Sequence, residues 1–124
     1  MQNLVFIAVG GALGAMARYA VSNGIHAVFG RAFPYGTLTV NVLGCLIMGF
    51  LYIVFFERLS NMLALRATLM IGFLGAFTTF STFSIETFNL LENGEGFKAL
   101  INILVSLVVC LIATWAGVII GREI

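Results

Sequence analysis

The sequence predicts an all-α integral membrane protein with four transmembrane helices, the third of which is broken near Gly75–Thr79. Two observations support this fold class. The 124 residues are 61% hydrophobic and 9% charged, which is more apolar surface than a soluble domain of this size can bury. The apolar residues also fall into four runs, each long enough to cross a bilayer as a helix. We predict a single four-helix transmembrane domain, residues 1–124, with spans at about 4–22, 37–56, 67–91 and 99–121.

Composition also excludes several classes of function. A formal net charge of +1 argues against nucleic acid as a partner. The sequence contains no Asp and a single His, His26, so neither a catalytic triad nor paired carboxylates can be assembled, and we predict that the protein is not an enzyme. Cys45 and Cys110 fall within predicted spans without CxxC spacing and are interpreted as small core residues.

The first span contains Gly10 and Gly14, a GxxxG pair that lets another helix approach closely. Arg18 follows roughly 14 residues into this span, which begins at about Leu4, and so lies about 21 Å along the helix. Two interpretations of Arg18 stay open. Its side chain anchors the helix by reaching the far membrane interface, or its charge draws anions into a pore mouth.

The segment Ser22–Gly36 is predicted to be a loop, because it holds His26, Arg31 and the only proline, Pro34. In the second span Thr37, Asn41 and Cys45 recur every four residues and share one face of the helix. An amide in lipid must find a partner. Asn41 therefore either joins two helices or faces an ion.

The third span follows a predicted loop at residues 57–66, and its centre, Gly72–Glu86, is the most unusual stretch of the chain. Glycine loosens a helix, and Ser and Thr side chains compete for its backbone hydrogen bonds. We therefore predict a break near Gly75–Thr79. Unpaired backbone at this depth is tolerated only inside protein or beside water, so a broken helix here indicates a site. The alternative is an intact helix whose small residues pack against a neighbour.

The fourth span follows a predicted loop at residues 92–98 and carries a polar or small residue at every fourth position. At 3.6 residues per turn these positions drift around the helix and form a slanting track, which consists of Asn102, Ser106, Cys110 and Thr114. Gly117 and Gly121 give a second GxxxG spacing, which is interpreted as a helix-packing feature.

The distribution of basic residues predicts an antiparallel, dual-topology homodimer. Four spans place both termini on one side, together with Arg58, Arg66 and Arg122. Arg31 and Lys98 lie opposite, joined by Arg18 if its side chain reaches that interface. Orientation in the membrane follows the bias of Lys and Arg between the two sides, and here that bias is almost absent. Either orientation should insert about equally well. A lone four-helix unit rarely encloses a pathway, which also favours a dimer.

The polar groups within the spans are mostly neutral donors, and Phe rings add partial positive charge at their edges. This combination suits a small anion that must bind weakly enough to leave. Phe80 and Phe83 can lie on one helix face, either to line such a pathway or simply to pack. The carbonyl groups freed around Gly75 and Thr78 are hard, uncharged ligands, which suit Na⁺. The candidate donors are Asn41, Asn102, Ser81, Thr82, Ser106 and Thr114.

Three segments together resemble the CrcB/Fluc family of fluoride channels. The first is the core motif at residues 72–86, GFLGAFTTFSTFSIE. The second is GTLTVN at residues 36–41, and the third is GGALG at residues 10–14 followed by Arg18 and Tyr19. The resemblance covers essentially the whole chain, and the core motif is highly specific.

The resemblance implies a function and a set of sites. Family members form dual-topology homodimers in the cell (inner) membrane, with two antiparallel pores, and passively export fluoride that has entered as HF. The equivalents of Asn41, Phe80 and Phe83 line the pores, Ser106 and Thr114 match the polar track, and Ser81 and Thr82 belong to the core motif. Backbone oxygens of Gly75 and Thr78 correspond to the ligands of a structural Na⁺ that is not transported. Cys110 replaces a serine common in the family, and no role is assigned to Asn102 or Glu86.

Two alternative functions share features with this sequence. A small multidrug exporter shares the size, the four spans and the dual topology, but it needs a glutamate in the first span, and this chain has none there. A membrane subunit that transports nothing and only supports partner proteins would have an intact third helix and tolerate substitution of Thr78 and Phe80.

Overall fold

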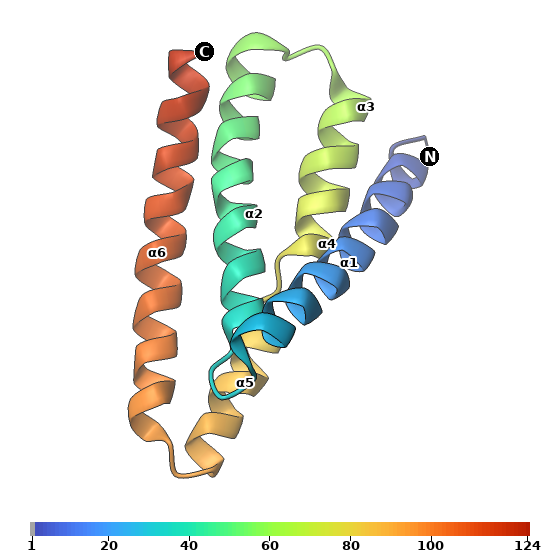
Figure 1. Cartoon of the computed structure of the whole chain (residues 1–124). Coiled ribbons are helices and arrows are strands. Elements are labelled where there is room, and N and C mark those ends of the chain that lie inside the picture. The colour runs from blue at the N-terminus through green and yellow to red at the C-terminus, as the bar shows by residue number, and fades with distance from the viewer. Residues whose placement is uncertain (1) are drawn as a thin grey trace.

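The computed structural model describes residues 2–124, which form helices joined by short turns (Figure 1). Four continuous stretches are long and apolar enough to cross a membrane, which confirms the four predicted spans: Gln2–Phe29, Tyr35–Arg58, Leu63–Glu92 and Gly96–Glu123. The individual elements are α1 (Gln2–Phe29), α2 (Tyr35–Ile53), η1 (Val54–Arg58), α3 (Leu63–Arg66), η2 (Ala67–Leu74), α4 (Gly75–Phe77), α5 (Phe80–Glu92) and α6 (Gly96–Glu123). The η elements are π-helical turns, in which the backbone bonds from i to i+5.

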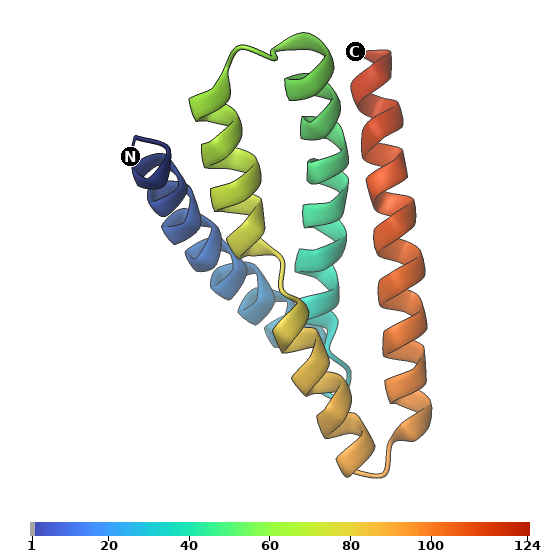
Figure 2. The same ribbon diagram turned by 180° about the vertical axis from the view of Figure 1, so that it is seen from behind.

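The four stretches alternate in direction, so both ends of the described chain lie at the same end of the bundle (Figure 1). Consequently α2 and α6 run in the same direction and lie side by side, as the reverse view also shows (Figure 2). Helix α1 crosses the bundle obliquely and packs against η2 and α4. The third stretch thus lies between α1 on one side and α2 on the other.

The prediction that Ser22–Gly36 is a loop is wrong for its first half, because α1 continues to Phe29. The helix ends where Gly30 adopts φ +83°, and the Gly30 N–H caps it by donating to the His26 carbonyl at 2.8 Å. His26 is thereby a buried helical residue, and its Nε2 accepts the Gly36 N–H at 2.9 Å. The last turns of α1 thus hold the start of α2, which a loop could not do as rigidly.

Small residues allow the closest helix contacts. A Cβ added to Gly10 would meet the Thr68 carbonyl, and one added to Gly14 would meet the Phe73 carbonyl, so α1 and η2 touch through their backbones. Between α2 and α6, Gly49 faces the Thr114 carbonyl and Gly117 faces the Leu46 carbonyl in the same way. Both GxxxG pairs therefore pack helices, as predicted.

The third stretch changes conformation in its middle. The short helix α4 ends at Phe77, after which Thr78 (φ −85°, ψ 156°) and Thr79 (φ −150°, ψ 119°) are extended. Helix α5 then begins at Phe80, and the Thr79 hydroxyl accepts the Thr82 N–H as its N-cap. Figure 1 shows the chain leaving the helix between α4 and α5.

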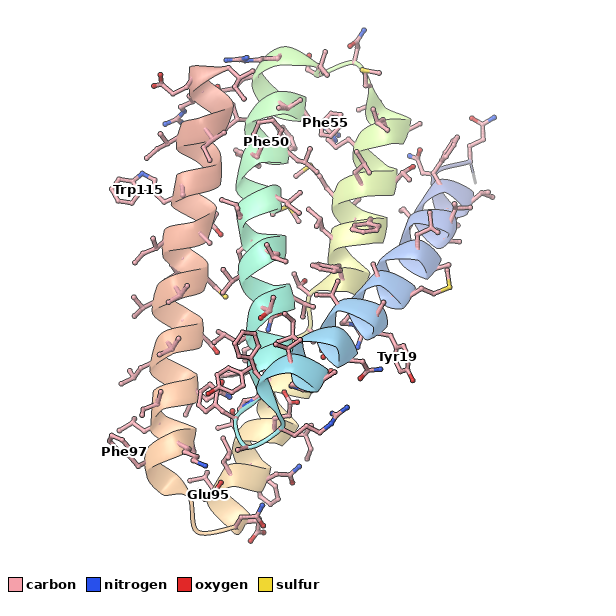
Figure 3. All side chains as sticks on the ribbon, in the orientation of Figure 1. Tyr19, Phe50, Phe55, Glu95, Phe97 and Trp115 are labelled. Carbon is pink, nitrogen blue, oxygen red and sulfur yellow. The ribbon has the colours of Figure 1, made fainter. Side chains whose placement is uncertain are left out.

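Much of the outer surface is apolar, as expected for a bundle in contact with lipid. Tyr19, Phe97 and Trp115 point away from the bundle, whereas Phe55 is buried between helices (Figure 3). A buried core between α2 and the third stretch consists of Val40 from α2 and of Leu74 and Phe77 from the third stretch. This core fixes α2 against the extended residues and so positions the site described next.

Candidate functional site

The amide of Asn41 replaces the helical partners of the extended backbone. Its Oδ1 accepts the Thr79 N–H at 2.8 Å, and its Nδ2 donates to the Thr79 carbonyl at 3.1 Å. Both backbone groups of Thr79 are thereby satisfied by one side chain from α2. An unpaired backbone group costs several kcal/mol in hydrocarbon, so this pair of bonds strongly favours the extended conformation.

Other backbone groups are released by the same conformation. In a continuous helix the Thr79 N–H would bond the Gly75 carbonyl, but it donates to Asn41 instead. The Thr82 N–H, which would bond the Thr78 carbonyl, donates to the Thr79 hydroxyl at 3.2 Å. The carbonyl oxygens of Gly75 and Thr78 are thus freed from helical bonding. Gly75 lies on the exposed surface of the chain.

Arg18 replaces a further helical hydrogen-bond donor, on the opposite side of the third stretch. Its Nε–H donates to the Ala76 carbonyl at 2.9 Å, in place of the Phe80 N–H of a continuous helix. The guanidinium is partly buried and adds positive charge at the carboxyl end of α4, where helical carbonyls carry partial negative charge. Helices α1 and α2 therefore each contribute one side chain to the interrupted backbone.

A groove of about 360 Å³ lies along α2, α5 and α6 beside the extended residues. It brings together five of the residues expected to line a pore, from three different helices. The lining residues carry no formal charge: Asn41, Gly44, Cys45, Met48, Thr78, Thr79, Phe80, Phe83, Ser106, Leu107, Cys110, Leu111 and Thr114. The groove thus offers an amide, hydroxyls, thiols and aromatic rings in otherwise apolar surroundings.

Two aromatic rings stand at the α5 side of the groove. The ring centroids of Phe80 and Phe83 are 5.4 Å apart and the planes are tilted by 45°. Phe80 directly follows the extended residues, and its side chain is 74% exposed in the single chain. A tilted pair presents ring edges as well as faces, and the edges carry the partial positive charge.

The polar track of α6 divides into two parts. Asn102 is buried and its Nδ2 donates to the Thr87 hydroxyl at 2.9 Å, while its Oδ1 accepts the Ser106 hydroxyl at 3.4 Å. This network joins α5 to α6. Thr114 lies further along the groove and donates to the Cys110 carbonyl at 3.0 Å. A hydroxyl can exchange such a bond for a passing anion cheaply, because a neutral hydrogen bond contributes only about 0.5–1.5 kcal/mol net.

Asn102 and Thr87 were not recognised as partners from the sequence. Asn102 appeared only as a member of a periodic track, and Thr87 lies just outside the core motif. Their contact joins residues fifteen positions apart across the turn between α5 and α6. The polar character of Thr87 inside a span was the one available signal.

A second pocket, of about 350 Å³, lies at the end of the bundle where α1 joins α2. Its lining includes His26, Arg31, Glu86 and Glu95. Among the side chains of residues 2–124, Glu86 Oε1 is a buried oxygen with no hydrogen-bond partner. The pocket is polar, in contrast with the groove, and also includes residues of the turn between α5 and α6.

Several expected site residues lie outside the groove. Arg18 contacts the third stretch from the α1 side, and Gly75 is the exposed first residue of α4. Ser81 is exposed on α5, and the Thr82 hydroxyl accepts the Thr79 hydroxyl at 3.0 Å. These four residues thus surround the interruption, whereas Asn41, Phe80, Phe83, Ser106 and Thr114 share the groove.

Comparison with known proteins gives consistent matches along the chain. Residues 5–118 match the family model described as "CrcB-like protein, Camphor Resistance (CrcB)". A protein of Magnetococcus marinus named "Fluoride-specific ion channel FluC" is 50% identical over 99% of this chain and 100% of its own. Proteins of the same name from Coxiella burnetii (50% identical; 99% and 100% covered) and Geobacter sulfurreducens (49%; 100% of both) are similar to the same extent.

Proposed function

Because the chain belongs to the CrcB family, we propose that it is a fluoride-specific ion channel that lets fluoride leave the cytoplasm passively. One structural observation supports this function independently of the family name. The groove combines hydrogen-bond donors with aromatic ring edges and has no charged lining residue. Such a lining can replace part of the hydration of a small anion without holding the anion too tightly to release it.

The proposed pathway follows the groove. Ring edges of Phe80 and Phe83 and the hydroxyls of Ser106 and Thr114 would contact the ion in turn. Asn41 donates one Nδ2 hydrogen to the Thr79 carbonyl, and an amide has a second, which would point toward the ion. In this proposal Asn41 both holds the extended backbone and contributes to the pathway. Ser81, Thr82 and Arg18 would act at its ends, with Arg18 raising the local concentration of anions.

The proposed assembly is an antiparallel, dual-topology homodimer in the cell (inner) membrane. The support is the exposure of polar backbone: Gly75 lies at the surface of the single chain beside the extended residues. Lipid cannot satisfy freed carbonyl groups at that depth, so another protein surface must cover them. A second copy would also cover Phe80 and convert the open groove into a closed pathway.

A structural Na⁺ at the centre of that dimer fits the chemistry of the donors. The Gly75 and Thr78 carbonyl oxygens are uncharged, hard ligands that the extended conformation frees from helical bonds. Two such carbonyls from each chain would give four oxygen ligands. The bound ion would add positive charge beside the interrupted helices. The residues of this chain would hold it there, and the proposal assigns it no part in conduction.

Fluoride efflux from liposomes that contain the purified protein tests the function. A fluoride electrode should record rapid release through the protein, and the same liposomes loaded with chloride should release almost none. Absence of fluoride release from folded, dimeric protein would contradict the proposal. The family membership would then reflect ancestry alone, and a role as a non-transporting membrane subunit would become the leading explanation.

A further inference from the structure

The two cysteines of the chain line the same groove, although 65 positions separate them in the sequence (110 − 45). Cys45 projects from α2 and Cys110 from α6, and both line the groove. Each side chain is half-buried, so the pair is sheltered but can still be reached through the groove.

The register of α2 and α6 explains this pairing. The two helices run in the same direction, and they touch through their backbones where Gly49 meets the Thr114 carbonyl. Cys45 comes four residues before Gly49, and Cys110 comes four residues before Thr114. Four residues are about one helical turn, so both cysteines lie one turn from this contact and on the same helix faces as its two members. Close backbone packing therefore places the two cysteines at the same level of the two helices, where both side chains line the groove.

The surroundings of the two cysteines favour a soft metal ion, bound in a complex that has no net charge. The neighbouring side chains along the groove are apolar or neutral, and Met48 adds another polarizable sulfur atom. A pair of thiolates would leave two negative charges in a low-dielectric region, which costs much free energy. A divalent cation bound by both thiolates removes that cost, because the complex is neutral. Two sulfur ligands also fit a linear site better than the four-ligand geometry typical of structural zinc.

We propose that Cys45 and Cys110 form a two-coordinate site for a soft divalent cation, of which Hg(II) is the clearest case. With neutral mercuric chloride, two S–Hg bonds form as two S–H and two Hg–Cl bonds break. Two protons and two chloride ions leave, and no oxidation state changes. Thiolates are the preferred ligands of soft metals, and the neutral chloride can reach the groove from lipid or water.

Binding would also affect the pathway proposed above, and this consequence rests on that proposed function. The metal would join α2 to α6 within the groove, between Asn41 on one helix and Thr114 on the other. A bulky complex there would obstruct a small anion and would add a polarizing centre beside it. Fluoride efflux should therefore stop when one Hg(II) per chain is bound and recover when a competing dithiol removes the metal.

Binding is measured first, without transport. Purified protein in detergent is treated with mercuric chloride and desalted, and bound mercury and remaining free thiols are counted after denaturation. We expect one mercury and no free thiol per chain, together with the ultraviolet absorption of sulfur-to-mercury charge transfer. The variants C45S, C110S and C45S/C110S are the matched controls, and the double variant contains no cysteine.

Competition with a monothiol separates a two-sulfur site from a single reactive thiol. Each single variant should release its mercury at about 100-fold lower competitor concentration than the unaltered protein, because tethering a second ligand typically adds at least that factor. Equal retention in C45S, C110S and the unaltered protein would overturn the proposal. One mercury per dimer, bridging two chains, would overturn it as well.

Flux then tests the consequence, with each variant compared with its own rate before mercury is added. Block in the unaltered protein and resistance in C45S/C110S are expected. Mercury bound with the stated stoichiometry but without block would overturn the effect on the pathway while leaving the site. If the protein released no fluoride at all, the binding measurement would still decide whether the site exists, so the two failures are distinguishable.

Discussion

Asn41 forms two hydrogen bonds with the backbone of a single residue, Thr79, which lies 38 positions further along the chain. The amide accepts from the Thr79 N–H and donates to its carbonyl, as a neighbouring strand or helix turn would do. One side chain thus performs the task of backbone hydrogen bonds where the third stretch leaves the helix. This relationship gives Asn41 a structural role in addition to its place in the groove.

Substitution of Asn41 should separate these two roles. Asn41→Asp removes the donor to the Thr79 carbonyl and places a negative charge beside the groove. Two charges 4 Å apart repel by about 4 kcal/mol at an effective dielectric constant near 20. We therefore expect fluoride efflux to fall by more than about 100-fold, since each 1.4 kcal/mol is about a factor of ten.

Asn41→Leu is the matched control, because it has a similar volume and no charge. It leaves both Thr79 groups without partners, at a cost of about 1–3 kcal/mol each. The thermal stability of the Leu variant in detergent should therefore fall. Normal efflux in the Asp variant would contradict the role of Asn41 in the pathway. Normal thermal stability in the Leu variant would contradict its structural role.

Phe80→Ile tests whether a ring edge contacts the ion. The substitution keeps an apolar side chain but removes the partial positive charge of the ring, which contributes about 0.5–1.5 kcal/mol in aromatic contacts. We expect fluoride efflux to decrease by about tenfold. Phe88→Ile is the control, since Phe88 lies on the same helix, is also exposed and does not line the groove. Equal rates for both variants would argue against coordination by the ring.

Gly117→Ala tests the close packing of α2 and α6. The added methyl group would meet the Leu46 carbonyl and the Phe50 nitrogen, which belong to the backbone and cannot rotate away. Overpacking of this kind typically costs about 1–3 kcal/mol. The apparent unfolding temperature in detergent should fall, whereas Gly24→Ala, with no atom within 4 Å of its new methyl group, should leave it unchanged.

Gly75→Ala tests the proposed dimer contact without disturbing the fold of the single chain. Within one chain the nearest atom to an added Cβ is the Met70 carbonyl oxygen at 3.9 Å, which is an ordinary contact. The helical content should stay the same by circular dichroism. If a second copy and an ion lie against Gly75, the methyl group will crowd them, and the dimer should dissociate at higher protein concentration. An unchanged dimer would mean that this surface faces lipid.

Replacing Na⁺ by a large organic cation throughout purification should weaken the dimer. The freed Gly75 and Thr78 carbonyl groups would lose their cation and would face each other as like dipoles. Subunit exchange between two differently labelled preparations gives the measurement, and restoring Na⁺ should slow the exchange again. Exchange rates that do not depend on the cation would contradict a structural sodium ion.

The apolar runs predicted the four spans well, because length and composition alone determine whether a segment can cross a membrane. The GxxxG pairs correctly indicated close helix contacts. A missing side chain allows close backbone approach whichever helix packs against it. The end of α1 was predicted seven residues early. Polar residues and His26 suggested a loop, but Val21, Ile25 and Phe29 continue the helix until Gly30 turns it.

Partners across the fold could not be predicted. Nothing local to Asn41 indicates that it bonds Thr79, and the same holds for Arg18 and the Ala76 carbonyl or for Asn102 and Thr87. The shared position of Cys45 and Cys110 in the groove depends on the register of two helices that are far apart in sequence. Each of these contacts is decided by packing, which a single sequence does not encode in a readable pattern.

The positions of Arg18 and Asn41 have a consequence for how the protein is made. Both side chains that satisfy the interrupted backbone come from segments that the ribosome completes before the third stretch emerges. The partners are therefore already in the membrane when Ala76 and Thr79 arrive. Insertion of the third stretch does not have to wait for α6. A circularly permuted chain that begins at Asn61, in the turn before the third stretch, would synthesise both partners after the interruption and should insert with lower yield.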